Sequence, residues 1–312
     1  MKRYITIDGG TTNTRVTLVC DGELCDSIKL KAGARACGDD RESFEKMLSD
    51  AIKDILCRNS ISEGDIEKIL ASGMITSEMG LCPLSHIRIP AGINELSETK
   101  YEALIENISE IPFVFIRGVK KEGESIDDFD VMRGEETELI GAQKGDGECV
   151  YMLMGTHSKI IKTDKDGKII DFCTMLTGEM TECISKNTIL KNSLVLCEGD
   201  SDKEYLKMGY EFCRDKSLSE ALFKVRVLKN FMNKSDNSVY SFFMGAVLCG
   251  DVDYVLRENP PKVVVGGNKF LKKAVSTLLC EYSKADIREM TEEEVEKSTP
   301  CAVVKIYEKS LA

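Results

Sequence analysis

The sequence of 312 residues predicts an α/β protein of two related lobes, each with a mixed sheet flanked by helices. Two observations support this fold class. Short apolar segments typical of strands alternate with longer amphipathic segments typical of helices. In addition, one arrangement occurs twice, over residues 5–30 and 149–173: a strand, a Gly-Thr turn, a basic residue just beyond it, and an Asp-Gly hairpin.

Composition sets the class of protein. With 42% apolar and 30% charged residues the chain is expected to be globular, and its length suggests about two domains. A net charge of −11 argues against a broad nucleic-acid or anionic-membrane surface, because both need clustered cations. The 13 cysteines include no C-x-x-C pair, as expected for reduced thiols in the cytoplasm. No segment is apolar over a membrane-spanning length. The sequence leaves a homodimer open as an alternative to a monomer.

The first lobe is expected over residues 1–120. Beyond the first hairpins, its expected elements are a helix over 41–58, a strand over 68–71 that opens into the loop 72–77, a helix over 100–108 and a strand over 113–116. The acidic, glycine-bearing segment 120–130 is the expected crossing between the lobes.

The second lobe is expected over residues 121–312. Its elements are a helix over 134–143, the second copy of the hairpins, a helical block over 178–234, a long apolar helix over 239–256, a strand over 262–265, a helix over 269–282, a strand over 286–290 and a final helix over 294–311.

The two Gly-Thr turns are candidate phosphate loops, because they combine close backbone approach, N–H groups and hydroxyls. Ordinary hairpins are the alternative, but two such turns at corresponding points of two half-chains favour a polyphosphate gripped from both lobes across a cleft. Arg15 or Lys159 could add positive charge, whereas for His157 a structural role is preferred. The expected donors are Gly9, Gly10, Thr11, Thr12, Asn13, Gly155, Thr156, His157 and Ser158.

A further glycine pair follows the strand that ends near Val265. Gly266-Gly267-Asn268 stands at the expected start of a helix, where the backbone could lie against a base or a ribose; the alternative is a tight turn between strand and helix. Neither a Rossmann fingerprint nor a Walker loop occurs.

The order of these motifs resembles the actin, hexokinase and Hsp70 superfamily, with phosphate-1, phosphate-2 and adenosine motifs in sequence. Within it, residues 72–77, 131–142, 155–159 and 177–179 resemble the 2-dehydro-3-deoxygalactonokinase family over essentially the whole chain. The resemblance implies two ribonuclease H-like lobes of the actin-like ATPase fold. It also implies ATP-dependent, Mg²⁺-assisted phosphorylation of the 6-hydroxyl of 2-dehydro-3-deoxy-D-galactonate.

The resemblance suggests roles for particular side chains. Asp8 ends the first strand and would hold Mg²⁺ directly or through water, since that ion takes few carboxylates. Glu135, with Glu136 as the alternative, would accept the proton of the sugar hydroxyl. Arg133 would bind the sugar carboxylate bidentately. The sugar-pocket candidates are Gly73, Met74, Thr76 and Ser77, and the remaining nucleotide-binding candidates are Asp8, Gly178, Gly266, Gly267 and Asn268.

Two rival functions remain open. The nearer is a kinase of another sugar or sugar acid on the same fold. The other is a non-catalytic ATP-dependent binding protein, which is disfavoured because the acidic helix start at Arg133-Gly134-Glu135-Glu136 would have no evident use there.

Overall fold

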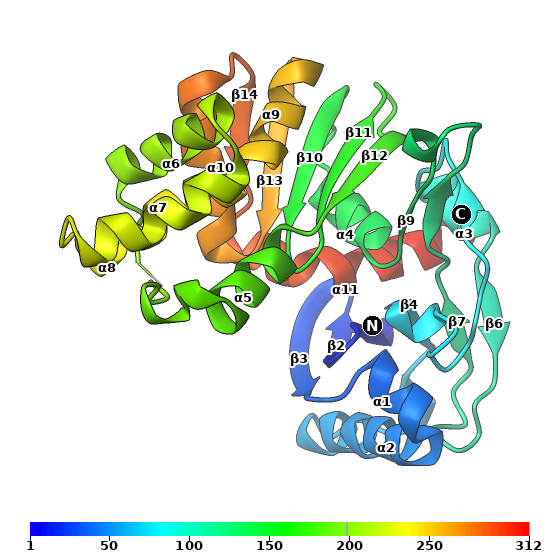
Figure 1. Ribbon diagram of the computed structural model, residues 1–312. Coiled ribbons are helices and arrows are strands. Elements are labelled where there is room, and N and C mark those ends of the chain that lie inside the picture. Colours follow the sequence, from blue (N-terminus) through cyan, green and yellow to red (C-terminus); the bar gives the residue numbers. More distant parts are fainter. Residues whose placement is uncertain (198, 312) are drawn as a thin grey trace. The chain divides into compact units, whose positions relative to one another are not determined.

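The computed structural model describes residues 1–197 and 199–311, and they form two compact α/β units (Figure 1). Unit 1 contains Met1–Gly145, Gly167–Asp171 and Glu292–Ala312, and unit 2 contains Asp146–Asp166 and Phe172–Thr291. These units differ from the lobes expected over 1–120 and 121–312. The helix near residue 135 and the last helix both group with unit 1, because they pack against each other and the last helix packs against the first strand.

Unit 1 is built on a six-stranded sheet of order β3-β2-β1-β4-β7-β6. Its strands are β1 Arg3–Gly9, β2 Thr14–Cys20, β3 Glu23–Leu30, β4 Lys68–Gly73, β6 Tyr101–Ala103 and β7 Phe113–Phe115. β1 to β3 form the expected antiparallel hairpins, with Asp8 opposite Arg15. The second turn has positive φ at Asp21 and Gly22, which explains its Asp-Gly sequence.

Helices cover both faces of this sheet. α2 (Arg41–Arg58) spans the predicted residues and buries Phe44, Leu48, Ile52 and Ile55 against one face. α4 (Glu135–Ala142) and α11 (Glu292–Lys309) also belong to this unit, and the rings of Tyr4 and Tyr307 meet edge to face at 5.8 Å between centroids. The short helices of the unit are α1 Ala34–Asp39, α3 Ile93–Glu98, η1 Glu63–Asp65, η2 Met74–Thr76 and η3 Ile126–Asp128.

Two expectations for unit 1 are wrong. Residues 101–103 form β6, antiparallel to β7, where a helix over 100–108 was expected; the helix lies earlier, as α3. Segment 120–130 is no crossing between the units. It joins β8 (Val119–Lys121) to β9 (Asp130–Met132) in a small three-stranded sheet with β5 (Ile87–Arg88), and this pairing holds it within unit 1.

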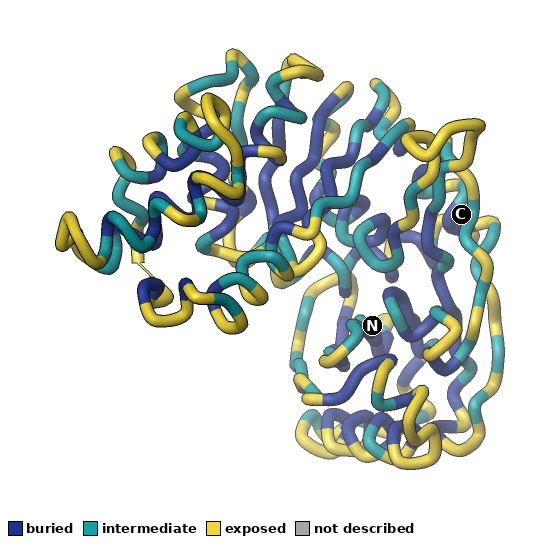
Figure 2. The backbone as a smooth tube through the Cα atoms, in the orientation of Figure 1, coloured by how far each residue is buried: buried dark blue, intermediate teal, exposed yellow. Residues whose placement is uncertain are grey.

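Unit 2 repeats the central strand order of unit 1. Its sheet runs β12-β11-β10-β13-β14, which corresponds to β3-β2-β1-β4-β7. The strands are β10 Cys149–Met154, β11 Ser158–Thr163, β12 Ile169–Met175, β13 Lys262–Gly267 and β14 Asp286–Glu289. β10 is buried along its whole length (Figure 2). The duplicated hairpin therefore marks two copies of one fold.

Helices pack on one face of this sheet around a core that includes Met152, Phe243 and Val265. They are α5 Thr177–Asn187, α6 Lys203–Asp215, α7 Leu218–Asn230, α8 Asp236–Val247, α9 Cys249–Glu258, α10 Lys269–Tyr282 and η4 Ile189–Asn192. The long helix expected over 239–256 is wrong, because the chain breaks at Leu248 between α8 and α9. Within the described residues no single helix meets the length and hydropathy needed to cross a membrane; α8 and α9 do so as a pair bent by 47°.

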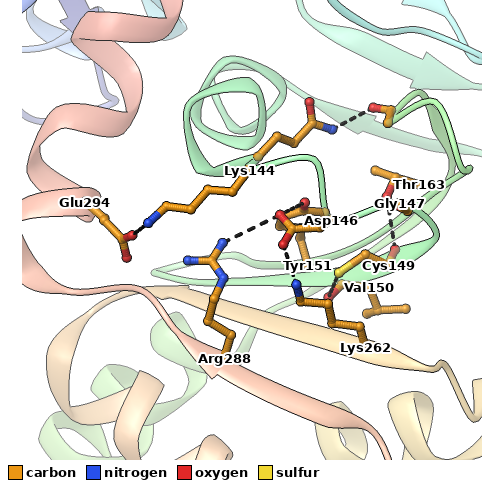
Figure 3. A network of polar contacts seen from close by, with 12 residues as sticks. Lys144, Asp146, Gly147, Cys149, Val150, Tyr151, Thr163, Lys262, Arg288 and Glu294 are labelled. Carbon is orange, nitrogen blue, oxygen red and sulfur yellow. Dashed lines mark hydrogen bonds and ion pairs between the residues drawn. The ribbon is translucent and has the colours of Figure 1, made fainter.

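A cluster of charged side chains around the buried Asp146 carboxylate lies at the amino-terminal edge of the unit 2 sheet (Figure 3). The Asp146 side chain is 3% exposed and accepts hydrogen bonds from the Tyr151 hydroxyl at 2.7 Å and Lys262 Nζ at 2.6 Å. Arg288 lies 3.7 Å away. Burial and the Asp146 contact raise the pKa of Tyr151. Since these residues lie just before or on β10, β13 and β14, the cluster fixes the three strands together.

Candidate functional site

The carboxyl ends of β1 and β4 place the predicted residues of unit 1 together. The two strands are parallel, with Asp8 beside Ser72 and Gly9 beside Gly73. Gly73 has φ of 83°, and a Cβ there would lie 2.5 Å from Gly9 O and 3.4 Å from Asp8 Oδ1. A Cβ on Gly134, just before α4, would lie 3.2 Å from Gly73 Cα. These glycines let the start of α4 approach Asp8.

The two predicted glutamates at that helix start behave differently. Glu136 is fully buried; both of its carboxylate oxygens accept from the Gly134 N–H, and Oε1 also accepts from the Thr137 hydroxyl. Glu135 is half-buried, and its Oε2 accepts from the Arg133 N–H at 2.9 Å. Of the two, Glu135 therefore has the accessible carboxylate.

Three acidic side chains of unit 1 act on one another electrostatically. Burial and the charge of Glu135 raise the pKa of Asp8, while Arg15 opposes the shift. Burial, followed by the charges of Glu135 and Asp8, raises the pKa of Glu138 to about 8. The sequence analysis missed Glu138, although its spacing of three residues from Glu135 puts it on the same helix face. We call Asp8, Glu135 and Glu138 the carboxylate cluster.

Arg133 is engaged by the protein itself. Its Nη1 donates to Thr76 O at 2.7 Å and Thr76 Oγ1 at 2.6 Å, and its Nη2 donates to Leu84 O at 2.9 Å. Nη2 also lies 3.3 Å from His86 Nδ1. Burial, followed by the charge of Arg133, lowers the pKa of His86 to about 4. The guanidinium therefore fixes the loop after β4, and its bidentate contact to a sugar carboxylate stays a prediction.

The other sugar-pocket candidates form a tight turn after β4. Thr76 is buried and donates to Gly73 O at 3.0 Å, while Ser77 Oγ donates to Met74 O at 2.7 Å. Met74 is half-buried. Ser72 is fully buried, and its hydroxyl has no hydrogen-bond partner within residues 1–197 and 199–311. Since Ser72 and Asp8 are neighbours in parallel strands, their side chains lie on the same face of the sheet.

Backbone hydrogen bonds fix the first Gly-Thr turn. Gly10 N donates to Asn13 O at 2.8 Å, and the amides of Ala34 and Arg35 donate to Gly10 O and Thr11 O. Gly9 has no room for a side chain, because a Cβ would lie 2.7 Å from the Ile75 Cβ. Thr12 and Asn13 are exposed. The tip of the turn is thus accessible on a fixed backbone.

The second Gly-Thr turn, in unit 2, has an exposed tip at Thr156 and His157, and His157 Nε2 lies 2.7 Å from Glu179 Oε2. Ser158 is fully buried, with no hydrogen-bond partner for its hydroxyl among the residues described. Lys159 donates to Thr174 Oγ1 at 2.6 Å. Lys159 lies opposite Leu153 as Arg15 lies opposite Asp8, so the basic residues of the two copies are equivalent.

Two further segments border this second turn. Gly178, near the start of α5, lies against Gly155 and Thr156. Gly267 has φ of 90°, and a Cβ there would lie 2.7 Å from Met154 N. Asn268 N donates to Met154 O, and its side chain caps α10 by accepting from Phe270 N and Leu271 N. The candidates at 155–159, 178 and 266–268 therefore lie side by side in unit 2.

The donor set of unit 1 fits a magnesium ion held by few protein ligands. In the part of the chain that the structure describes, no three histidine, cysteine, aspartate or glutamate side chains are grouped to hold a metal by themselves. Mg²⁺ typically keeps several waters and takes one or two carboxylates. The half-buried Asp8 suits that mode of binding, and it lies beside Ser72, whose buried hydroxyl has no partner among the residues that the structure describes.

A comparison with known protein families shows the family of this chain. The family described as 2-keto-3-deoxy-galactonokinase matches residues 8–297. The chain belongs to this family of sugar-acid kinases. The 2-dehydro-3-deoxygalactonokinase of Escherichia coli K12 is 26% identical over 269 residues, which are 85% of this kinase and 85% of the relative.

Solved structures place the kinase in the expected fold. A Sinorhizobium meliloti structure described as a 2-dehydro-3-deoxygalactonokinase protein has a TM-score of 0.80 at 19% identity, and the match covers 98% of this chain and 96% of the other. The activator of 2-hydroxyisocaproyl-CoA dehydratase from Clostridium difficile, solved with bound ADPNP, has a TM-score of 0.54 at 12% identity over 99% and 96% of the two chains. The predicted actin-like ATPase fold is thereby confirmed.

Proposed function

We propose that this kinase transfers the γ-phosphoryl group of ATP to the 6-hydroxyl of 2-dehydro-3-deoxy-D-galactonate, a step in galactonate breakdown in the cytoplasm. The observation that carries the proposal is the carboxylate cluster at the ends of β1 and β4, in a chain that belongs to a sugar-acid kinase family. Phosphoryl transfer needs a carboxylate near the attacking hydroxyl and a second one for the metal, and this cluster offers both.

In this mechanism Glu135 accepts the proton as the 6-hydroxyl oxygen attacks the γ-phosphorus. The bond between that phosphorus and the bridging oxygen breaks, and ADP leaves with the electron pair. Asp8 would hold Mg²⁺ directly or through water, and the ion would supply positive charge to the phosphate oxygens. The hydrogen bond from the Arg133 N–H orients the Glu135 carboxylate, and the buried Glu136 secures the helix start.

The Gly-Thr turns would bind the phosphates of ATP. Gly9 to Asn13 and Gly155 to Ser158 offer backbone N–H groups and hydroxyls, and Arg15 and Lys159 add positive charge nearby. Gly178 and the segment 266–268 border the second turn, which supports a nucleotide site there. The loop over residues 73–77, braced by Arg133, would line the sugar pocket in unit 1.

A substrate panel tests the proposal. The purified kinase is assayed with ATP and Mg²⁺ by coupled detection of ADP, using 2-dehydro-3-deoxy-D-galactonate, its C4 epimer, galactonate and galactose. We expect the highest kcat/KM with the first compound. Higher kcat/KM with another acid would reassign the substrate within the same reaction class. ADP release that is indifferent to every sugar would favour the binding-protein alternative.

A further inference from the structure

The start of helix α5 rests directly on the second Gly-Thr turn. A Cβ on Gly178 would collide with Gly155 O and would lie 2.8 Å from Thr156 Cα. The Glu179 N–H donates to Thr156 O at 2.9 Å. The backbone of the turn and the first turn of α5 are therefore in contact, and a shift of one displaces the other.

A buried carboxylate holds this helix start. The Thr177 hydroxyl donates to Asp251 Oδ1 at 2.8 Å and Oδ2 at 3.0 Å, and both residues are 3% exposed. Asp251 lies on α9, beside the core residue Val252. Burial raises the pKa of Asp251 to about 6, and the hydrogen bond from Thr177 opposes that shift.

Helix α5 buries few of its own residues in the described structure. Within its eleven residues, Thr177 and Ser185 are the buried ones, and Leu176 at its amino end provides no side-chain cap. A buried carboxylate is costly unless a donor satisfies it. In the described part of the chain Thr177 is the side chain that donates to Asp251, so this pair holds the amino end of α5, whereas Ile184 packs on the core farther along the helix.

We propose that Asp251 is a positioning residue for ATP binding, which acts through the Thr177 hydroxyl to fix the start of α5 and thereby the backbone of turn 155–157. This inference rests on the proposed role of that turn in holding the nucleotide phosphates. Asp251 itself does not touch the nucleotide. Loss of the contact should weaken nucleotide binding while the sugar acid binds as before.

The experiment compares matched pairs of variants. Asp251→Asn and Thr177→Val disrupt the contact with little change of shape, whereas Thr177→Ser keeps the hydroxyl. Asp253→Asn is the control, because Asp253 also lies on α9 and accepts from the Tyr210 hydroxyl at 2.7 Å, a contact to α6. For each variant, KM for ATP, KM for 2-dehydro-3-deoxy-D-galactonate, Kd of ADP by calorimetry and the thermal unfolding midpoint are measured.

We expect Asp251→Asn and Thr177→Val to raise KM for ATP and Kd for ADP about tenfold, with KM for the sugar acid within twofold of the wild type. The double variant should be no worse than either single one, because both remove the same contact. Thr177→Ser and Asp253→Asn should keep wild-type ADP binding. If folded Asp251→Asn and Thr177→Val bind ADP as the wild type does, or if Asp253→Asn weakens it equally, the inference fails. A wild-type protein that binds no ADP would overturn the proposed function as well.

Discussion

Gly73 and Gly267 occupy equivalent positions in the two units. Each is the last residue of the strand that is parallel to the first strand of its hairpin copy, and their φ values are 83° and 90°. A Cβ on Gly73 would lie 2.5 Å from Gly9 O, and one on Gly267 would lie 2.7 Å from Met154 N. In both units the last residue of this strand therefore lies so close to the end of the neighbouring strand that only glycine fits.

The equivalence also shows where the copies have diverged. Asp8 of unit 1 corresponds to Leu153 of unit 2, because they lie opposite Arg15 and Lys159 respectively. Unit 1 thus carries an acidic side chain where unit 2 has a buried apolar one. This asymmetry agrees with the proposal that proton transfer and metal binding take place in unit 1 and that the backbone of unit 2 recognises the nucleotide.

Glu135→Gln should lower kcat about 100-fold or more, because the amide cannot take the hydroxyl proton. Affinity for ATP should be retained. Steady-state kinetics and ADP binding measure the two effects. Glu136→Gln is the matched control, and turnover should stay within a few-fold of the wild type because that side chain is buried against Gly134. Unchanged turnover in Glu135→Gln would remove the proposed base.

Arg133→Lys should raise KM for the sugar acid about tenfold and leave KM for ATP unchanged. A single ammonium cannot replace the hydrogen bonds to Thr76 O, Thr76 Oγ1 and Leu84 O, so the loop after β4 loses its brace. Lost buried hydrogen bonds cost about 1–3 kcal/mol, so the unfolding midpoint should also fall. Kinetics with each substrate varied in turn test this, and a defect confined to ATP would contradict it.

Gly178→Ala should raise KM for ATP, because the added methyl group would push α5 away from Gly155 and Thr156. We expect an increase on the order of tenfold, with KM for the sugar acid preserved. Gly250→Ala is the control: Gly250 lies within α9, and a Cβ there meets nothing within 4 Å. That variant should keep its kinetics and gain up to about 1 kcal/mol in stability from helix propensity.

Glu138→Gln should change the pH dependence of stability. The pKa of Glu138 is raised from 4.5 to about 8, so the folded state binds more protons than the unfolded state between these values, and stability falls as pH rises through this range. Glutamine removes that loss. Without divalent metal, the free energy of unfolding of the variant should exceed that of the wild type by about 1–3 kcal/mol between pH 5 and pH 8. This gain is smaller than the full pKa shift implies, because the neighbouring carboxyl groups titrate together. Urea unfolding at several pH values measures the difference, and a gain independent of pH would contradict the assignment.

Local sequence patterns predicted the helices and strands whose bounds are set by neighbouring residues, such as turn and capping residues. The two hairpin copies follow from alternating apolar residues and Asp-Gly turns, and α10 spans the predicted residues because Asn268 caps it. The expected helix over 100–108 failed because strand pairing with β7 outweighed local propensity. Helix α4, which was expected in the second lobe, groups with unit 1 because it packs on α11, which is distant in sequence.

The candidate site was predictable to a similar degree. Motifs located Asp8, Glu135 and the turns, since glycine, threonine and acidic residues stand out in sequence. The contacts of Arg133 with Thr76 and Leu84, and of Asp251 with Thr177, join segments about 50 to 75 residues apart, so no local pattern reveals them. Glu138 could have been found from helix periodicity alone.

Helix α11 belongs to unit 1 although it follows all of unit 2 in the sequence, and this order affects how the chain folds. Tyr307 and Glu308 contact Tyr4, so the first strand is covered by residues near the other end of the sequence. During synthesis on the ribosome, the sheet that contains Asp8 stays uncovered on that face until α11 emerges, whereas all of unit 2 has already been translated. Removing the last helix should therefore expose the amino-terminal sheet to aggregation and proteolysis before it affects unit 2.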